Sequence, residues 1–171
     1  MYLKKNYPYY NKGKFYNNRY DVVRGSVLKT VILYIRSFLS LYYCYNQQLP
    51  VVCDYTNVSL NAEECYEPVI IPMGHATVLI MYRGLNILCD PVFGSSSVFF
   101  KRYVPCTPSP KVLPAIDYVL LSHDHPDHCD INSLKQVKKN NEKVEIFTPL
   151  NMKDILHKNN IYPTEEKTWW Q

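Results

Sequence analysis

The chain reads Leu120-Leu121-Ser122-His123-Asp124-His125-Pro126-Asp127-His128 at the point around which the rest of it is organised. This stretch holds three of the five histidines within six residues, together with two aspartates. The residues just before it, 116–121, are apolar and partly β-branched, which predicts a buried strand. A strand that ends in a ligand-rich loop is typical of an open α/β sheet, which presents its chemistry at the carboxyl edge.

The spacing of the candidate ligands has a physical meaning. Residues two apart, such as His123 and His125, point away from each other on a helix but share a face in an extended segment. Pro126 disfavours a helix here. We therefore expect His123 and His125 to share one metal ion and the following turn to aim Asp127 and His128 at a neighbouring one. Imidazole and carboxylate ligands suit zinc, with iron or manganese as alternatives. The competing interpretation is a histidine-rich surface loop.

His123-x-His125-x-Asp127-His128 after an apolar strand resembles the signature of the metallo-β-lactamase superfamily. Further segments resemble the branch that contains N-acyl-phosphatidylethanolamine phospholipase D and its bacterial relatives. They are Gly-His-Ala-Thr-Val-Leu-Ile at 74–80, Gly-Leu-Asn-Ile-Leu-Cys-Asp-Pro-Val-Phe at 84–93, Leu-Pro-Ala-Ile-Asp at 113–117, and Trp169-Trp170.

The resemblance implies a fold, a chemistry and roles for single residues. The fold is an α/β sandwich of the metallo-β-lactamase αββα type, and the complete family domain binds two zinc ions. The chemistry is metal-dependent hydrolysis of a phospholipid or another small ester. Asp127 would also orient the attacking nucleophile as a catalytic residue. His75, Asp90 and Asp130 are candidates to support the ligands; for His75 the alternative is a hydrogen-bonded structural histidine.

The sequence also departs from the family pattern. In the family, the second half of the domain supplies a third histidine to the first metal, a bridging carboxylate, and a last histidine to the second metal. After His128 this chain has one histidine, His157, so each ion keeps two ligands, fewer than the three that a catalytic zinc usually has. We therefore expect the N-terminal half of the domain, truncated, with weak metal binding and little activity unless a second chain supplies the missing half.

Two other functions remain open. The first is a non-enzymatic remnant or a membrane-attached interaction module. The second is a nuclease of the same superfamily, but the sequence shows no aromatic and basic platform for RNA, so no nucleic-acid partner is expected.

The N-terminal region differs in charge from the rest of the chain. Residues 1–26 carry six basic side chains and one acidic one, while the whole chain has a net charge of +4. We interpret 1–26 as a basic, irregular arm that contacts an anionic surface or is simply solvated. Residues 27–67 contain an amphipathic helix, 27–45, and a linker. Residues 68–171 form the half-domain.

The helix expected over residues 27–45 is a poor transmembrane segment. Arg36 would lie in the middle of the span, and no uncharged run reaches the roughly eighteen residues that a span needs. The alternatives are a helix at a membrane interface or one packed on the domain. The six cysteines form no C-x-x-C motif and no zinc-finger spacing, and their number does not establish a disulfide framework in a chain of this length, so a reducing compartment is the default expectation. We expect a cytoplasmic protein, with a peripheral membrane position as the alternative.

The remaining pattern predicts alternating strands and helices. Strands are expected at 69–71, 77–82, 85–89, 116–121, 143–149 and 166–170, with a hairpin turn at Arg83-Gly84. Asp130 is expected to cap a helix, and a second, short helix is expected at 151–158. Residues 94–114 are expected to form a long loop. This order predicts a sheet with its helices on one face.

Overall fold

The computed structural model describes residues 9–11, 14–16, 26–29, 31–33, 35–36, 60–95, 102 and 104–168, and the statements below concern these residues. The chain divides into a smaller unit, which comprises Met1–Pro50 and Trp170, and a larger unit, which comprises Val51–Trp169 and Gln171. Each unit is described by itself.

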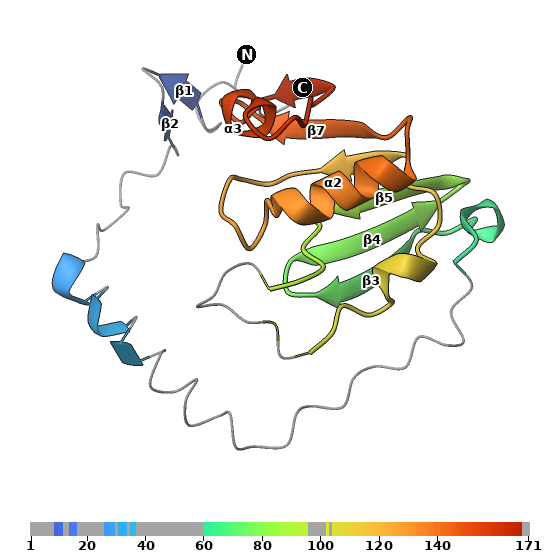
Figure 1. The fold of residues 1–171 in the computed structure, drawn as a ribbon, viewed down its shortest axis with the longest axis horizontal. Helices are drawn as coiled ribbons and strands as arrows, with labels where there is room; N and C mark the ends of the chain where they lie inside the picture. Colours follow the sequence, from blue (N-terminus) through green and yellow to red (C-terminus); the bar gives the residue numbers. More distant parts are fainter. Residues whose placement is uncertain are drawn as a thin grey trace, which may run out of the picture. The chain divides into compact units, whose positions relative to one another are not determined.

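The larger unit is built on one six-stranded sheet with the order β3-β4-β5-β6-β7-β8 (Figure 1). The β3–β4 and β4–β5 pairs are antiparallel, whereas β5, β6, β7 and β8 run parallel to one another. The strands are β3 Val69–Gly74, β4 Thr77–Tyr82, β5 Leu85–Cys89, β6 Tyr118–Leu120, β7 Glu145–Pro149 and β8 Glu165–Lys167. The helical elements are α2 Ile131–Asn140, α3 Lys153–His157 and the 3₁₀ turns η1 Ala62–Glu64 and η2 Pro110–Val112. The expected mixed α/β sheet is confirmed.

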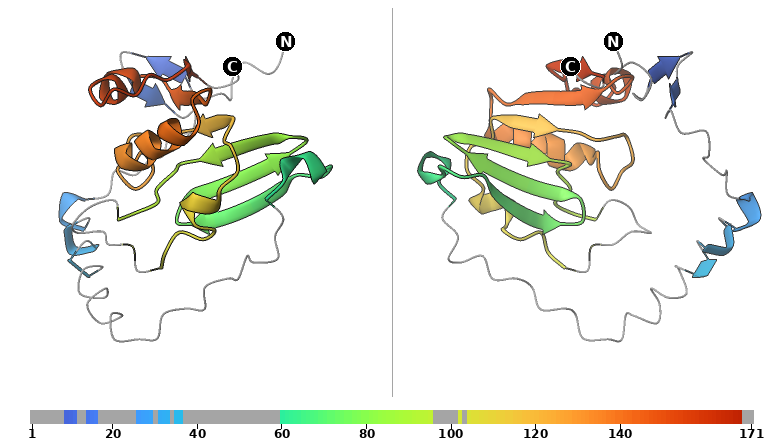
Figure 2. Two further views of the ribbon diagram at one scale, coloured as in Figure 1. Left: turned by 45° about the vertical axis from the view of Figure 1, so that its right-hand side comes forward. Right: turned by 180° about the vertical axis from the view of Figure 1, so that it is seen from behind.

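Helix α2 covers one face of this sheet and encloses the core. It lies in front of the strands in Figure 1 and behind them in the reverse view of Figure 2. Leu134 and Val137 face inward from the helix and are buried. The strands contribute alternate residues to the same core, because successive side chains of a strand point to opposite faces; the fully buried members include Leu79, Met81, Leu88, Val119 and Ile146.

The opposite face of the sheet is also apolar but is much more accessible. Ile70 is 62% exposed, Leu85 41% and Leu120 40%. Val78 and Ile80, which alternate with buried residues in β4, are only partly buried. A sheet face of this composition is normally packed against another layer.

Several element boundaries differ from the sequence prediction. β6 begins at Tyr118 rather than at Ile116, and α3 covers Lys153–His157 rather than all of 151–158. β7 begins at Glu145 rather than at 143, and β8 covers Glu165–Lys167. Trp169 and Trp170, on which part of the last predicted strand falls, lie outside the described residues.

The smaller unit contains a short hairpin where an irregular arm was expected. β1, Tyr9–Asn11, pairs antiparallel with β2, Lys14–Tyr16. Residues 27–29, 31–33 and 35–36 are helical, in agreement with the start of the predicted helix, and their side chains are exposed. The rest of the predicted helix, most of the linker, and residues 96–101 and 103 of the long loop lie outside the described residues. Among the helices that are described, none has the length and apolar character needed to cross a bilayer.

The β4–β5 hairpin provides a local test of the fold. Its two turn residues both have positive φ, 47° at Arg83 and 82° at Gly84, as two-residue hairpin turns of this kind require. We expect Gly84→Ala to lower the free energy of unfolding by about 1–2 kcal/mol, because a Cβ disfavours this left-handed conformation. Urea denaturation measures the effect. Gly94→Ala is the matched control, since a Cβ at Gly94 would meet no atom within 4 Å and its φ is not positive. Equal losses in both variants would contradict the argument.

Candidate metal centre

Three segments meet at one edge of the sheet to form the candidate site. The first is the His75-Ala76 turn between β3 and β4, and the second is Asp90, which follows β5. The third is the loop after β6, residues 121–129. Val78 pairs with Cys89 and Cys89 with Leu120, so the start of β4 lies beside the carboxyl ends of β5 and β6. The site thus lies at the edge where open α/β sheets place their functional residues.

The first pair of predicted ligands lies close together. His123 Nε2 and His125 Nδ1 are 3.1 Å apart, and their ring centroids are 4.6 Å apart. His123 Nδ1 contacts the Ser122 hydroxyl at 2.8 Å, which leaves Nε2 directed toward His125. The amides of His128 and Cys129 both donate to the His125 carbonyl, at 2.9 and 2.7 Å, and so fix the turn that follows Pro126.

The second group joins Asp127 and His128 with a residue from another segment. Asp127 Oδ2 lies 3.9 Å from His128 Nε2 and 3.0 Å from His75 Nε2. One ligand atom from each of the three residues lies within 4.8 Å of the other two. The His75 and His128 rings pack edge to face, with centroids 5.3 Å apart. The structure therefore brings all four predicted ligands to one place and adds His75 to them.

Asp90 orients this group from behind. Its side chain accepts three hydrogen bonds: His128 Nδ1 and the Ser122 hydroxyl donate to Oδ2 at 2.8 and 2.6 Å, and the Ser122 amide donates to Oδ1 at 2.8 Å. Because Nδ1 of His128 is held by Asp90, its Nε2 faces Asp127. Many metal sites have this arrangement, in which a carboxylate fixes the ring and tautomer of a ligating histidine.

Thr77 and Ser122 are site residues to which the sequence prediction gave no role. The Thr77 hydroxyl donates to the Asp90 carbonyl at 2.8 Å and accepts from the Val92 amide at 3.0 Å, so it fixes the loop that carries Asp90. Thr77 is fully buried, although its side chain is polar. An inward-facing threonine at the start of an otherwise apolar strand was the sequence signal that could have identified it.

Asp130 has a different role from the predicted support of a ligand. Its Oδ1 accepts from the Asn132 amide at 3.3 Å, and its Oδ2 accepts from the amide and hydroxyl of Ser133 at 3.1 and 2.5 Å. The carboxylate therefore caps α2, as its position before the helix also indicated. The Ser133 hydroxyl in turn accepts from the Phe93 amide at 2.8 Å. Asp130 thus supports the segment after Asp90 only indirectly.

The charge of Asp127 suits a metal ligand. Desolvation alone would raise its pKa, but a backbone hydrogen bond, the hydrogen bond from His75 and the nearby charges of His128 and His75 together lower the pKa below its usual value. The carboxylate is therefore ionised at neutral pH, the form that binds metal. Four histidines (three in the 121–129 loop and His75 in the turn), an ionised carboxylate and the orienting Asp90 form a donor set that fits zinc, with iron or manganese as alternatives.

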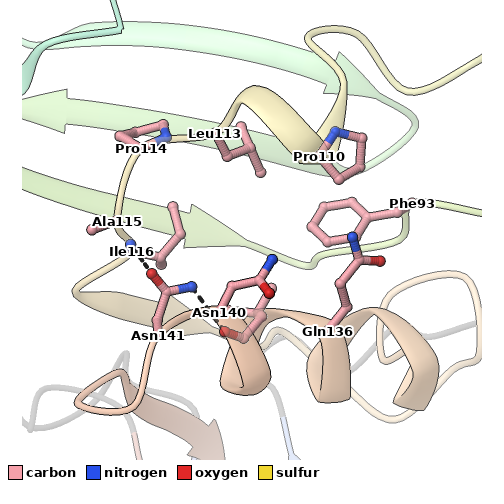
Figure 3. Close-up of a pocket in the computed structure, with 10 residues that line it drawn as sticks. Phe93, Pro110, Leu113, Pro114, Ala115, Ile116, Gln136, Asn140 and Asn141 are labelled. Atoms are coloured by element: carbon pink, nitrogen blue, oxygen red, sulfur yellow. Dashed lines mark hydrogen bonds between the residues drawn. The ribbon is translucent and has the colours of Figure 1, made fainter.

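The structure also shows what does not belong to this centre. His157 is an exposed residue of α3, and its ring lies against that of Tyr162. A cavity of about 190 Å³ between η2 and α2 is lined by residues such as Phe93, Leu113 and Asn141, and Figure 3 shows Asn141 hydrogen-bonded to the Ile116 amide inside it. None of the metal-ligand candidates lines that cavity.

Cys129 follows His128 directly, and its environment predicts an unreactive thiol. Burial raises its pKa to about 11, with the negative charges of Asp124, Asp130 and Asp90 adding to the effect. Because the thiolate is the reactive form, we expect alkylation of Cys129 by iodoacetamide at pH 8 to be about a hundredfold slower than for an unperturbed thiol. Mass-spectrometric mapping of labelled peptides measures the rate, with the urea-unfolded chain as reference. Equal labelling of Cys129 in both states would contradict this prediction.

The sequence matches one family model and several curated proteins. Residues 85–169 match the model of the β-lactamase superfamily domain. Over 86 residues the chain is 36% identical to "N-acyl-phosphatidylethanolamine-hydrolyzing phospholipase D 1" of Caenorhabditis elegans, covering 47% of this chain and 24% of that protein. Over 103 residues it is 30% identical to the mitochondrial protein of the same activity name from Saccharomyces cerevisiae, covering 58% and 22%. The chain thus spans about a quarter of the length of these relatives.

A solved structure shows a similar but weaker likeness. CmlA, a diiron β-hydroxylase from Streptomyces venezuelae, superposes with a TM-score of 0.45 at 24% identity, over 58% of this chain and 20% of that one. The sequence match, which contains the whole of His123-x-His125-x-Asp127-His128, is the stronger result. Residues 85–169 therefore belong to the metallo-β-lactamase superfamily, and the chain resembles its N-acyl-phosphatidylethanolamine phospholipase D branch.

Proposed function

We propose that this chain supplies the first metal-binding half of a phospholipase D-like hydrolase that acts on N-acyl-phosphatidylethanolamine or a related phospholipid. The observation that carries the proposal is the convergence of His123, His125, Asp127 and His128 at one sheet edge, with Asp90 behind His128. The names of the two matched phospholipases support the choice of substrate class.

The residues divide the work as follows. His123 and His125 would hold one ion, and Asp127 and His128 the neighbouring one. Bound metal ions supply Lewis-acid activation of water and of the phosphoryl oxygen. Asp127 also accepts a hydrogen bond from the attacking water and so orients it toward phosphorus. Water oxygen bonds to phosphorus as the phosphorus–oxygen bond to the N-acylethanolamine breaks. The water proton goes to that leaving alcohol, and phosphatidic acid is the other product.

The catalytic unit needs more than the described residues provide. His123 and His125 give the first ion two protein ligands, and one more is expected at a catalytic zinc. The partly exposed face that carries Ile70, Leu85 and Leu120 would also be covered in a complete two-layer sandwich. We propose that a second half, in the same protein or from a second chain, supplies both, and that this chain alone hydrolyses little substrate. A non-enzymatic interaction module, which the same exposed face favours, is the second candidate.

The proposed function can be tested in a chimera. Residues 85–169 of this chain would replace the matched segment of the Caenorhabditis elegans relative, and release of phosphatidic acid from N-acyl-phosphatidylethanolamine would be measured with zinc present. We expect the chimera to be active and the His123→Ala and Asp127→Asn chimeras to lose nearly all activity. His157→Ala is the matched histidine control. A folded, zinc-loaded chimera without activity would contradict the proposal, as would robust turnover by this chain alone.

We further propose that the N-terminal unit attaches the chain to an anionic phospholipid surface. Residues 1–50 carry eight basic side chains and one acidic one. In the helical residues, apolar side chains such as Val27, Leu28 and Leu33 are more than 60% exposed, and the exposed Lys29 and Arg36 supply positive charge. An exposed helix with apolar and basic groups suits a membrane interface. Flotation of the full chain with anionic vesicles should fall in the Lys29→Glu/Arg36→Glu variant; unchanged flotation would contradict this proposal.

A further inference from the structure

His75 is better placed for coordination than a supporting residue needs to be. Its Nε2 lies 3.0 Å from Asp127 Oδ2, which itself lies 3.9 Å from His128 Nε2. One ligand atom from each of these three residues lies within 4.8 Å of the other two. Tetrahedral zinc with ligands at about 2.0–2.2 Å places its ligand atoms roughly 3.3 Å apart. The three atoms therefore reach a common ion with side-chain shifts of no more than about 1.5 Å.

The backbone around His75 holds it in this position. His75 is one of the non-glycine residues with positive φ, 52°, and it follows Gly74 with φ 109°. A left-handed conformation at a residue with a Cβ costs free energy, and such residues cluster at functional sites. The turn is held on both sides. Arg102 packs against Gly74, where a Cβ would come within 2.6 Å of its guanidinium, and Thr77 ties the start of β4 to the Asp90 carbonyl.

Asp90 and Thr77 couple His75 to His128. Thr77, two residues after His75, bonds to the backbone of Asp90, and the Asp90 side chain bonds to His128 Nδ1 at 2.8 Å. The hydrogen bonds of Asp90 thus link the chain segment that carries His75 to the ring of His128. The His75 side chain is nevertheless 53% exposed. A histidine whose role is only structural is normally buried with its partners, whereas this one presents a ring nitrogen to an open carboxylate.

We propose that His75 is the third protein ligand of the metal position held by Asp127 and His128. The inference rests on the proposed metal-dependent function and changes the number of protein ligands assigned to one of the two ions. The sequence count gives two ligands to each ion, but with His75 the described residues supply a full set of three at one position and two, His123 and His125, at the other. The Asp127–His128 position would then fill first and bind more tightly, without any group from a second half.

The test is a Co²⁺ titration of the full chain, followed by the cobalt absorption bands and by X-ray absorption of the first bound equivalent. We expect one tight equivalent with two histidine nitrogens. His75→Ala should weaken it at least tenfold and leave one histidine nitrogen. His75→Gln should weaken Co²⁺ binding to a similar extent. The glutamine amide can still donate a hydrogen bond to Asp127, but it is a poor metal ligand. His157→Ala is the matched control and should leave the first equivalent unchanged.

The outcomes separate this inference from the proposal on which it rests. Wild-type affinity in His75→Gln would show that His75 only positions Asp127 and would overturn the inference. Unchanged cobalt binding in His75→Ala, with binding lost in His128→Ala, would also overturn it and leave the metal-dependent function standing. A wild-type chain that binds no Co²⁺ would overturn the inference alone, because the proposed function assigns further ligands to a second half and is tested by the chimera. Circular dichroism of each variant before metal addition shows whether the fold is retained.

Discussion

Replacing Asp90 by asparagine should lower the zinc affinity of the full chain by about 10- to 100-fold, as the loss of a residue that orients a ligand typically does. The Asp90 carboxylate, whose residue is 6% exposed, accepts from His128 Nδ1 and from both the amide and the hydroxyl of Ser122. The side-chain oxygen of an asparagine can still accept the hydrogen bond from the Ser122 amide. Its NH₂ group, however, cannot accept a hydrogen bond from His128 Nδ1, so the tautomer that leaves Nε2 free for the metal is no longer favoured.

A chelator-competition titration with zinc measures this loss, and Asp130→Asn provides the matched control. The Asp130→Asn substitution makes the same chemical change at a carboxylate that caps α2. Asparagine caps a helix about as well as aspartate. We therefore expect Asp130→Asn to keep its zinc affinity within about twofold. If both variants lost affinity equally, the effect would come from the negative charge near the site and not from the bond to His128.

Replacing Thr77 by valine should lower the free energy of unfolding by about 2–4 kcal/mol, although the two side chains have nearly the same shape. The hydroxyl bonds to the Asp90 carbonyl and the Val92 amide, and all three residues are buried. Without it, one buried acceptor and one buried donor lose their partner, and each such loss costs about 1–3 kcal/mol. Zinc affinity should fall as well, because the segment that carries Asp90 is no longer fixed.

Thr148→Val is the control for this substitution, with urea denaturation as the measurement. Thr148 is also a buried strand residue, but its hydroxyl has no hydrogen-bond partner within the described structure. Removing an unpaired buried hydroxyl is expected to change stability by less than about 1 kcal/mol or to increase it. A Thr77→Val variant as stable as Thr148→Val would show that the bonds from Thr77 to Asp90 and Val92 contribute little.

The strands and the central motif could be predicted because their signals are local. The alternation in β4 and the Arg83-Gly84 step each depend on neighbouring residues, and the hairpin follows from them. The extended spacing of His123 and His125 likewise predicted that their nitrogens would approach each other. Asp130 shows the limit of such reasoning. Its capping role depends on neighbouring residues and was predicted. Whether its side chain also supports a metal ligand depends on the tertiary fold, which local sequence patterns do not report.

The contacts that complete the site join residues far apart in sequence. Thr77 bonds to residues 13 and 15 positions away, and His75 to one 52 positions away. No periodic pattern in the sequence predicts which distant residues form these hydrogen bonds. The boundary of β6 has the same cause, because the Ile116 amide donates to the side chain of Asn141, 25 residues later, and not to a neighbouring strand. The β1–β2 hairpin was missed since its short strands carry no hydrophobic alternation.

The order of the sheet has a consequence for how the protein is made. From β3 to β8, each strand lies beside the strand that precedes it in the chain. A ribosome therefore releases each strand next to a partner that has already emerged, which keeps loop closures short during co-translational folding. His75, Thr77, Asp90 and the 122–128 loop all precede α2, β7 and β8 in the chain. The nascent chain thus holds every residue of the metal centre described here before the last two strands of the sheet are synthesised.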